Sequence, residues 1–257
     1  MNDVTIIYYT DNRLDEPLNT ACQRHLAELS ERIDVPVISV SHIPIKLGHN
    51  IAIGKKKRGW KSVYRQLYIG VENAKTKYIA TAEHDCFYTE EHFKYSHIDD
   101  GAFNYNSNHW FVQFSEKRHS DLNGMYSRFR GERLALSQLI CRRDLLLSVI
   151  NTRFEMLSND YSPVRKYVFA GEPGLSKLRI YSNKKRFGEF EALPENIKNQ
   201  LNNEKYSSFK TKLPNLDVRH DNNLTGPKRG GERRWDLSPW GNFKEMVDKY
   251  GRNKKQK

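Results

Sequence analysis

The chain has 257 residues, 12% of them aromatic, with 43 Lys and Arg residues against 31 Asp and Glu residues. This length suffices for one large domain with its own apolar core, and the aromatic content excludes a largely disordered chain. The surplus of 12 positive charges favours a polyanionic partner, although a basic, soluble surface without such a partner has the same composition.

No segment has the composition of a membrane span. The early apolar run, residues 4–9, is too short for a signal sequence or a transmembrane helix, and no later run approaches membrane length. The three cysteines, Cys22, Cys86 and Cys141, are far apart and have the spacing of neither a disulfide framework nor a zinc site. We therefore expect a cytoplasmic protein in a reducing compartment.

The first third of the chain predicts strands and helices in alternation. Residues 4–9 are β-branched and aromatic and stop at a turn-forming cluster, which is typical of a buried strand. Apolar residues then recur every three or four positions over 18–33, as on one face of a helix, and a second strand follows at 37–40. This β-α-β order favours a parallel sheet with helices on its faces. Farther along we expect a loop over 47–59, a helix over 60–74 and a strand over 78–82.

The rest of the chain is expected to continue this pattern with more polar connections. We expect strands at 110–114, 136–141 and 216–220, helices at 143–152 and 243–250, and short helices and loops over 183–212. The predicted fold class is α/β, with a mixed, mostly parallel sheet flanked by helices. It occupies one domain over 1–225, followed by a basic segment over 226–257 that contains a short helix.

The strongest chemical signal is Glu83-His84-Asp85, directly after the strand predicted at 78–82. In open α/β sheets, ligands bind just outside the carboxyl ends of the strands. Two carboxylates spaced by one residue can both reach one site there, and hard divalent cations such as Mg²⁺ and Mn²⁺ prefer such oxygens. Solvated acids that cap a strand end have the same pattern, so the motif alone does not establish a metal site.

In the order of their elements, residues 4–115 resemble glycosyltransferases of the GT-A type. Those enzymes open with a strand and a nucleotide-binding turn, here Thr10, Asp11 and Asn12, and place a D-x-D-type metal motif after a later core strand. The resemblance implies a GT-A-like fold, a nucleotide-sugar donor, most often a UDP-sugar, and Mn²⁺ or Mg²⁺. Glu83 departs from the motif's first Asp, so Asp85 is the better-matched ligand.

Two further residues enter through this resemblance. In several GT-A families a late histidine completes the metal sphere, which implies His220 here, whereas a surface histidine beside an acid is the alternative. Glu172 lies in the turn Gly171–Gly174, where an acid can act as the general base of an inverting transfer. An exposed turn explains Glu172 equally simply, and a retaining transfer would leave it without this role.

Basic residues complete the set of candidates. Arg58, at the end of a run of lysines, and Arg65 complement the charge of a donor pyrophosphate, although a solvated basic loop has the same composition. Lys228, Arg229, Arg233 and Arg234 form a second basic run that suits the phosphate backbone of double-stranded DNA.

Three functions follow from these residues. The first is transfer of a sugar to a hydroxylated base in phage DNA, in the cytoplasm of a bacterium or a phage-infected host. The second is transfer to a cell-surface polysaccharide or a lipid-linked glycan. The third, a non-enzymatic nucleic-acid-binding protein, leaves Glu83 and Asp85 without an explanation.

Overall fold

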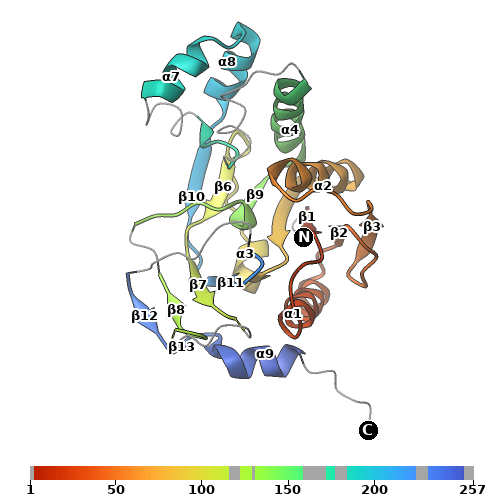
Figure 1. Ribbon diagram of the computed structural model, residues 1–257, viewed down its shortest axis with the longest axis vertical. Coiled ribbons are helices and arrows are strands. Elements are labelled where there is room, and N and C mark those ends of the chain that lie inside the picture. The colour runs from red at the N-terminus through yellow and green to blue at the C-terminus, as the bar shows by residue number, and fades with distance from the viewer. Residues whose placement is uncertain are drawn as a thin grey trace.

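The computed structural model describes residues 3–115, 122–128, 131–158, 172–176, 184–223 and 231–251. Its main sheet has seven strands in the order β10-β6-β9-β4-β1-β2-β3 (Figure 1). Strand β9 is antiparallel to both of its neighbours, and every other pairing in this sheet is parallel. The expected mixed, mostly parallel α/β sheet is therefore confirmed. The strands are β1 (Val4–Thr10), β2 (Val37–Ser41), β3 (His49–Ala52), β4 (Tyr78–Glu83), β6 (Phe103–Asn106), β9 (Leu139–Arg142) and β10 (Tyr206–Phe209).

Helices cover both faces of this sheet, which explains why β1 is buried along its whole length. Successive side chains of a strand point to opposite faces. Ile7 and Tyr9 accordingly pack with α2 and α4, whereas Ile6 and Tyr8 pack with α1 and α3. Gly70 allows α2 to approach closely, because a Cβ there would lie 2.5 Å from Cγ2 of Ile7. These helices are α1 (Leu18–Ile33), α2 (Trp60–Asn73), α3 (Glu90–Phe93) and α4 (Arg143–Ser158).

A second, five-stranded sheet has the order β12-β8-β7-β11-β5. Its apolar side chains, such as Val112 and Val218, pack with α1 and with Phe243 of the C-terminal helix α9. No helix among the described residues combines the length and the apolar character that crossing a membrane requires. The elements are β5 (Cys86–Phe87), β7 (His109–Gln113), β8 (Tyr126–Ser127), β11 (Asn215–Arg219), β12 (Arg233–Arg234) and α9 (Phe243–Gly251).

Two smaller groups of elements lie at opposite ends of the molecule (Figure 1). Helices α7 (Lys184–Glu191) and α8 (Glu195–Asn203) share a small apolar cluster with the end of α4. At the other end, the hairpin of β13 (Asp236–Leu237) and β14 (Gly241–Asn242) leads into α9, which packs on α1. The proposed division of the chain at residue 225 stays a prediction.

The structure corrects three sequence-based expectations. Residues 47–59 are not all loop, because His49–Ala52 form β3 at the sheet edge, where pairing on one side needs no continuous apolar run. The strand expected at 136–141 begins only at Leu139, after a 3₁₀ turn, η1 (Leu136–Gln138). Polar Tyr206–Phe209 form β10, another edge strand, within the region expected to hold only helices and loops.

The remaining expected elements are present with small shifts. Strands β2, β4, β7 and β11 lie within one residue of the predicted boundaries. Helix α4 continues to Ser158 rather than ending at residue 152. Helix ends of this kind are poorly defined by sequence because propensity changes little from one turn to the next.

Candidate active site

The candidate site forms where β1 and β4 end side by side. The two strands are parallel, and Tyr9 lies opposite Glu83 in their register. The turn after β1 therefore meets the acidic motif after β4, at the carboxyl edge where α/β proteins bind ligands. Thr10 Oγ1 lies 3.0 Å from Nδ1 of His84 and joins the two segments directly.

A third segment reaches the same place from the second sheet. Strand β11 pairs with β5, and the backbone NH of Val218 donates to the carbonyl of Asp85 at 2.8 Å. The chain then turns, so that Asn223 Nδ2 donates to Asp85 Oδ2 at 2.7 Å. His220, at the start of this turn, is held by its own backbone NH, which donates to Oδ1 of Asn223 at 2.6 Å.

His84, Asp85 and His220 together have the chemistry of a divalent-cation site. One ligand atom from each lies within 4.8 Å of the others, and Glu83, Asp85 and Cys86 form a second such group. Nε2 of His220 is buried and has no hydrogen-bond partner among the described residues, and its 3.5 Å approach to Asp85 Oδ2 is longer than a good hydrogen bond. A cation between these side chains would satisfy this buried nitrogen, so the residues fit a metal.

The donor atoms also restrict which metal fits. Two imidazoles with a carboxylate suit Mn²⁺ better than Mg²⁺, which prefers oxygen ligands throughout. Burial raises the pKa of the Cys86 thiol well above 9.0, which keeps it protonated. A thiol in that state is a poor ligand for a hard cation. Asp85, His84 and His220 are therefore the better group.

The two carboxylates of the motif differ in their electrostatic environment. Burial raises the pKa of Asp85, but contact with His220 and the charges of His84, His220 and Arg219 outweigh it and lower that pKa well below 3.8. Burial and the charges of Asp85 and Asp217 raise the pKa of Glu83 well above 4.5. Asp85 is thus the permanently charged carboxylate, and a cation nearby would favour the charged form of Glu83 as well.

A buried ion pair supports the site from the second sheet. Asp217 and Arg219 pair with each other on β11, and both are largely buried. Burial raises the pKa of Asp217, whereas the guanidinium of Arg219 lowers it. The charge of Arg219 also acts on Asp85 and Glu83, so this arginine balances part of the negative charge of the motif.

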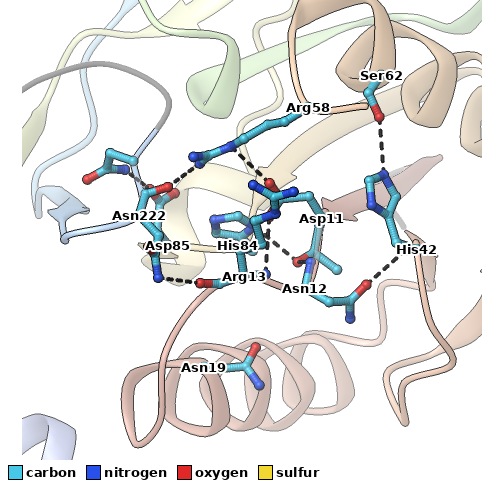
Figure 2. A network of polar contacts seen from close by, with 12 residues as sticks. Asp11, Asn12, Arg13, Asn19, His42, Arg58, Ser62, His84, Asp85 and Asn222 are labelled. Atoms are coloured by element: carbon cyan, nitrogen blue, oxygen red, sulfur yellow. Dashed lines mark hydrogen bonds and ion pairs between the residues drawn. The ribbon is translucent and has the colours of Figure 1, made fainter. Parts of the chain in front are cut away.

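A pocket lies between the acidic motif and the start of α2. Arg58 crosses it, with Nε 3.0 Å from Oδ2 of Asp11 and its guanidinium donating to the carbonyl of Asn222 (Figure 2). The volume of this pocket is about 50 Å³. The lining residues are Tyr9, Thr10, Asp11, Arg58, Gly59, Ser62, Val63, Gln66, Glu83, His84, Asp85 and Asn223.

Hydrogen bonds fix the turn that forms one wall of this pocket. Asn12 has a left-handed backbone, with φ of 58°, and its Oδ1 accepts from the backbone NH groups of His42 and Ile43 at 2.8 and 3.0 Å. Gln66 Nε2 donates to the carbonyl of Thr10 at 2.6 Å. The turn Thr10–Asn12 is therefore positioned by neighbours on three segments.

Most of the predicted site residues meet in this region. Thr10, Asp11, Arg58, Glu83 and Asp85 line the pocket, and Asn12 and His220 stand beside it. Arg65 lies exposed on α2 and does not line the pocket. The structure places it away from the predicted pyrophosphate position.

The remaining predicted residues lie farther out or outside the described ranges. Glu172 is half-buried, and its charge acts on Glu83 and Tyr105. The hydroxyl of Tyr105 donates to the carbonyl of Pro173 at 2.6 Å and holds that turn. Arg233 and Arg234 form the exposed strand β12, whereas Lys228 and Arg229 lie outside the described residues.

Sequence reasoning missed His84 and Asn223 as members of the site. His84 is the middle residue of the motif, but the motif is defined by its two acids. If the strand continued, the side chain of His84 would point to the face opposite the two acids. The chain turns at this point instead, so His84 faces Thr10. Nothing in the sequence marks Asn223, because its contact with Asp85 spans 138 residues.

No protein-family model matches the chain, and no curated protein sequence matches it significantly. Solved structures with a similar arrangement include a glycosyltransferase involved in the glycosylation of the major capsid of PBCV-1. It has 9% identity and a TM-score of 0.39, and the match covers 80% of this chain and 81% of that chain.

Two bacterial structures have a similar likeness. The S. aureus TarS fragment 1-349 in complex with UDP-GlcNAc has 12% identity and a TM-score of 0.39, with 90% of this chain and 60% of the fragment covered. GlyE of Streptococcus pneumoniae TIGR4, a glycosyltransferase, has 9% identity and a TM-score of 0.36, with 82% and 45% covered. At this level the likeness carries no conclusion about the activity of the present chain.

Proposed function

We propose that this protein is a metal-dependent glycosyltransferase that moves a sugar from a UDP-sugar to a hydroxyl group. The observation that supports it most is the cluster of Asp85, His84 and His220, which opens onto the pocket of Asp11 and Arg58. A cation site and an arginine that can bind a diphosphate, both at one sheet edge, suit such a transfer. A bound cation neutralises the charge that develops on the leaving diphosphate.

The side chains have separate tasks in this proposal. Asp85 holds the cation through a carboxylate that stays charged, and the two histidines complete the ligand set. Arg58 binds the diphosphate of the donor, and the turn Thr10–Asn12 contacts its nucleoside. Glu83 lies beside these ligands and gains charge when the cation binds.

Binding of the donor requires the pocket to widen. Ligand pockets for molecules of this kind hold about 300–1,000 Å³, far more than the present space beside Arg58. The bridge from Arg58 to Asp11 and to Asn222 closes the pocket. We infer that a donor diphosphate replaces Asp11 as the partner of Arg58, because a diphosphate offers the guanidinium more negative charge than one carboxylate does.

Glu172 is the proposed general base if the transfer inverts the sugar configuration. The charge of its carboxylate acts on Glu83. It belongs to a short described segment, 172–176, that is held against the main sheet through Tyr105. A base in this position would remove the proton of the acceptor hydroxyl during attack.

The proposed acceptor is a hydroxylated base in phage DNA. The net charge of +12 and the basic run that ends in the exposed Arg233 and Arg234 favour a polyanion. An enzyme that modifies a base within a duplex must extrude that base, and basic side chains hold the flanking phosphates meanwhile. If the protein does not bind DNA, we infer instead that the acceptor is a polysaccharide or a lipid-linked glycan.

A panel of nucleotide sugars tests the proposed reaction. We expect the protein with Mn²⁺ to release free nucleoside diphosphate from one or more UDP-sugars and to do so far more slowly in EDTA. Slow hydrolysis of the donor without any acceptor is enough for this test, so the result does not depend on the acceptor. Absence of nucleoside diphosphate release from every sugar in the panel would contradict the proposal.

A further inference from the structure

A second pocket, of about 520 Å³, lies between the ends of the two sheets. Its volume is within the range of sites that bind small organic ligands or their fragments. It is distinct from the pocket at Arg58, because the two have no lining residue in common. The lining residues are Ser107, His109, Arg128, Gly131, Glu132, Arg133, Lys210 and Glu232.

The lining is basic, and its cations come from two separate parts of the chain. Arg128 and Arg133 flank the loop after β8, and Lys210 follows β10. Within the described part of the chain, no carboxylate pairs with Arg128 or Lys210. Of the two acids in the lining, Glu232 is already paired with Arg234. The pocket therefore retains an excess of positive charge.

The pocket lies on the same edge of the main sheet as the candidate active site. Strands β4, β6 and β10 run in one direction, so Lys210 after β10 and Glu83 at the end of β4 share that edge. His109 and Cys86 flank β11 on its two sides, opposite Asn215 and Asp217. His109 and Cys86 are therefore two strand spacings apart across the sheet and offset by two residues along the strands. This arrangement separates their backbones by roughly 12 Å. One acceptor molecule can span that distance.

Charges also connect the two sites. The charge of Arg133 acts on Asp217, which in turn is affected by Asp85. The pocket edge continues into the second basic run, because Glu232 lines it and the backbone NH of Arg128 donates to the carbonyl of Glu232 at 2.9 Å. Arg233 and Arg234 follow directly as β12, paired with β8.

We propose that this pocket binds a phosphate of the DNA strand that carries the acceptor base. The inference rests on the proposed function, since it places the acceptor relative to the candidate active site. Arg128, Arg133 and Lys210 bind the phosphate, and Arg233 extends the basic surface to the next part of the strand. A donor diphosphate is a poorer candidate here, because Arg58 and the candidate cation ligands lie at the other pocket.

Binding of a short fluorescein-labelled DNA duplex tests the pocket. We expect the double variant Arg128→Ala/Lys210→Ala to bind more weakly, and the slope of log Kd against log salt to fall by about one for each phosphate contact removed. The duplex is titrated between about 50 and 200 mM salt, where such contacts change affinity steeply. The variant Arg128→Lys/Lys210→Arg keeps both charges and should restore the slope.

Lys205 and Lys75 provide a matched control. Lys205 precedes β10 just as Lys210 follows it, and Lys75 precedes β4, so both lie at the opposite edge of the sheet and both are exposed. The variant Lys75→Ala/Lys205→Ala loses the same charge and should keep the wild-type slope. Equal losses in the two double variants would show a general charge effect and overturn the proposal.

A second probe and a second readout separate the remaining outcomes. Poly(glycerol phosphate) carries phosphodiesters without bases, and binding of this polymer in place of DNA would overturn the assignment to a DNA strand. Donor hydrolysis is measured on the wild type and on the control Lys75→Ala/Lys205→Ala, which should hydrolyse the donor at the wild-type rate. If hydrolysis is absent from the wild type the proposed function fails, whereas unchanged DNA binding in Arg128→Ala/Lys210→Ala refutes the pocket alone.

Discussion

Nε2 of His220 lies 3.5 Å from Oδ2 of Asp85, and both side chains are buried. Asp85 lies in the turn between β4 and β5, His220 directly follows β11, and the pairing of β11 with β5 brings them together. In the part of the chain that the structure describes, Nε2 of this imidazole has no hydrogen-bond partner, which is costly for a buried polar atom unless something else binds it. A divalent cation would satisfy that nitrogen and the carboxylate at once, and the proposed chemistry follows from this arrangement.

The first prediction concerns the donor. UDP should raise the melting temperature of the protein in the presence of Mn²⁺ and much less in its absence, because a ligand that binds only the folded state stabilises it. At a UDP concentration of about 100 times Kd the gain is about 2.7 kcal/mol. Arg58→Ala should weaken this effect, since the guanidinium is the proposed diphosphate ligand. Differential scanning fluorimetry measures both.

Arg65→Ala is the matched control for Arg58, because Arg65 is exposed on α2 and does not line the pocket. It should leave the UDP-induced shift unchanged. The donor assignment would fail if all nucleoside diphosphates stabilised the protein equally, or if UDP had no effect with Mn²⁺ present.

Much of the fold was predictable from the sequence because buried strands and amphipathic helices have distinct periods. Residues 4–9 and the stripe over 18–33 predicted β1 and α1, and the run over 78–82 predicted β4, which leads into the acidic motif. Edge strands were missed for a physical reason. β3 is solvent-exposed along part of its length, so no apolar pattern distinguishes it from a loop.

The candidate site was predictable only in part. Asp85 was found because a motif after a core strand is a local signal, and a family resemblance drew attention to His220. Arg65 was expected near the donor because it follows a basic run, but helical geometry turns its side chain to solvent. The contacts of Asn223 and Arg219 with the motif depend on sheet pairing between distant segments, which one sequence does not reveal.

Glu172→Gln tests the proposed general base. The change keeps the size of the side chain and removes its ability to take a proton. We expect the rate of sugar transfer to fall by about 10²–10⁴, the usual contribution of general base catalysis, with the UDP-induced rise in melting temperature preserved. Transfer at the wild-type rate in Glu172→Gln would show that Glu172 is not the base. Another group would then take the proton, or the reaction would retain the sugar configuration without such a base.

The second basic run is expected to bind the DNA backbone. Replacing Lys228, Arg229, Arg233 and Arg234 with Ala should weaken binding of duplex DNA and lower its salt dependence, because fewer counterions are released. Slow donor hydrolysis should remain near the wild-type rate. Fluorescence anisotropy at low and at physiological salt measures this. If the wild-type protein does not bind DNA even at low salt, a glycan becomes the acceptor.

His92 makes the protein sensitive to acid. Burial, together with the charge of His109, lowers the pKa of His92 from 6.5 to about 3. The unfolded chain therefore binds a proton below about pH 6.5 that folded His92 does not bind, and stability falls as the pH drops from 6.5 towards 3. At about pH 5 this one histidine should cost about 2 kcal/mol of unfolding free energy.

His92→Phe should remove that part of the acid loss. The ring lies against Tyr88, Phe93 and Phe209. Neither of its nitrogens has a hydrogen-bond partner among the residues that the structure describes, so phenylalanine loses no polar contact there. Urea denaturation at about pH 7.5 and pH 5 measures the difference between wild type and variant. An equal loss of stability in both proteins would show that His92 is protonated in the folded state as well.

The most direct test of the account is Mn²⁺-dependent release of UDP from a UDP-sugar by the wild type and by Asp85→Asn. Asp100→Asn serves as the control, because Asp100 lies at the surface, pairs there with Lys77, and accepts a hydrogen bond from the hydroxyl of Tyr78 that an asparagine can also accept. The change removes the same charge as Asp85→Asn. We predict that Asp85→Asn folds normally but turns over about 10²–10³ times more slowly, whereas Asp100→Asn matches the wild type. Full activity of Asp85→Asn, or undiminished wild-type turnover in EDTA, would contradict a metal-dependent transferase with Asp85 as its principal ligand.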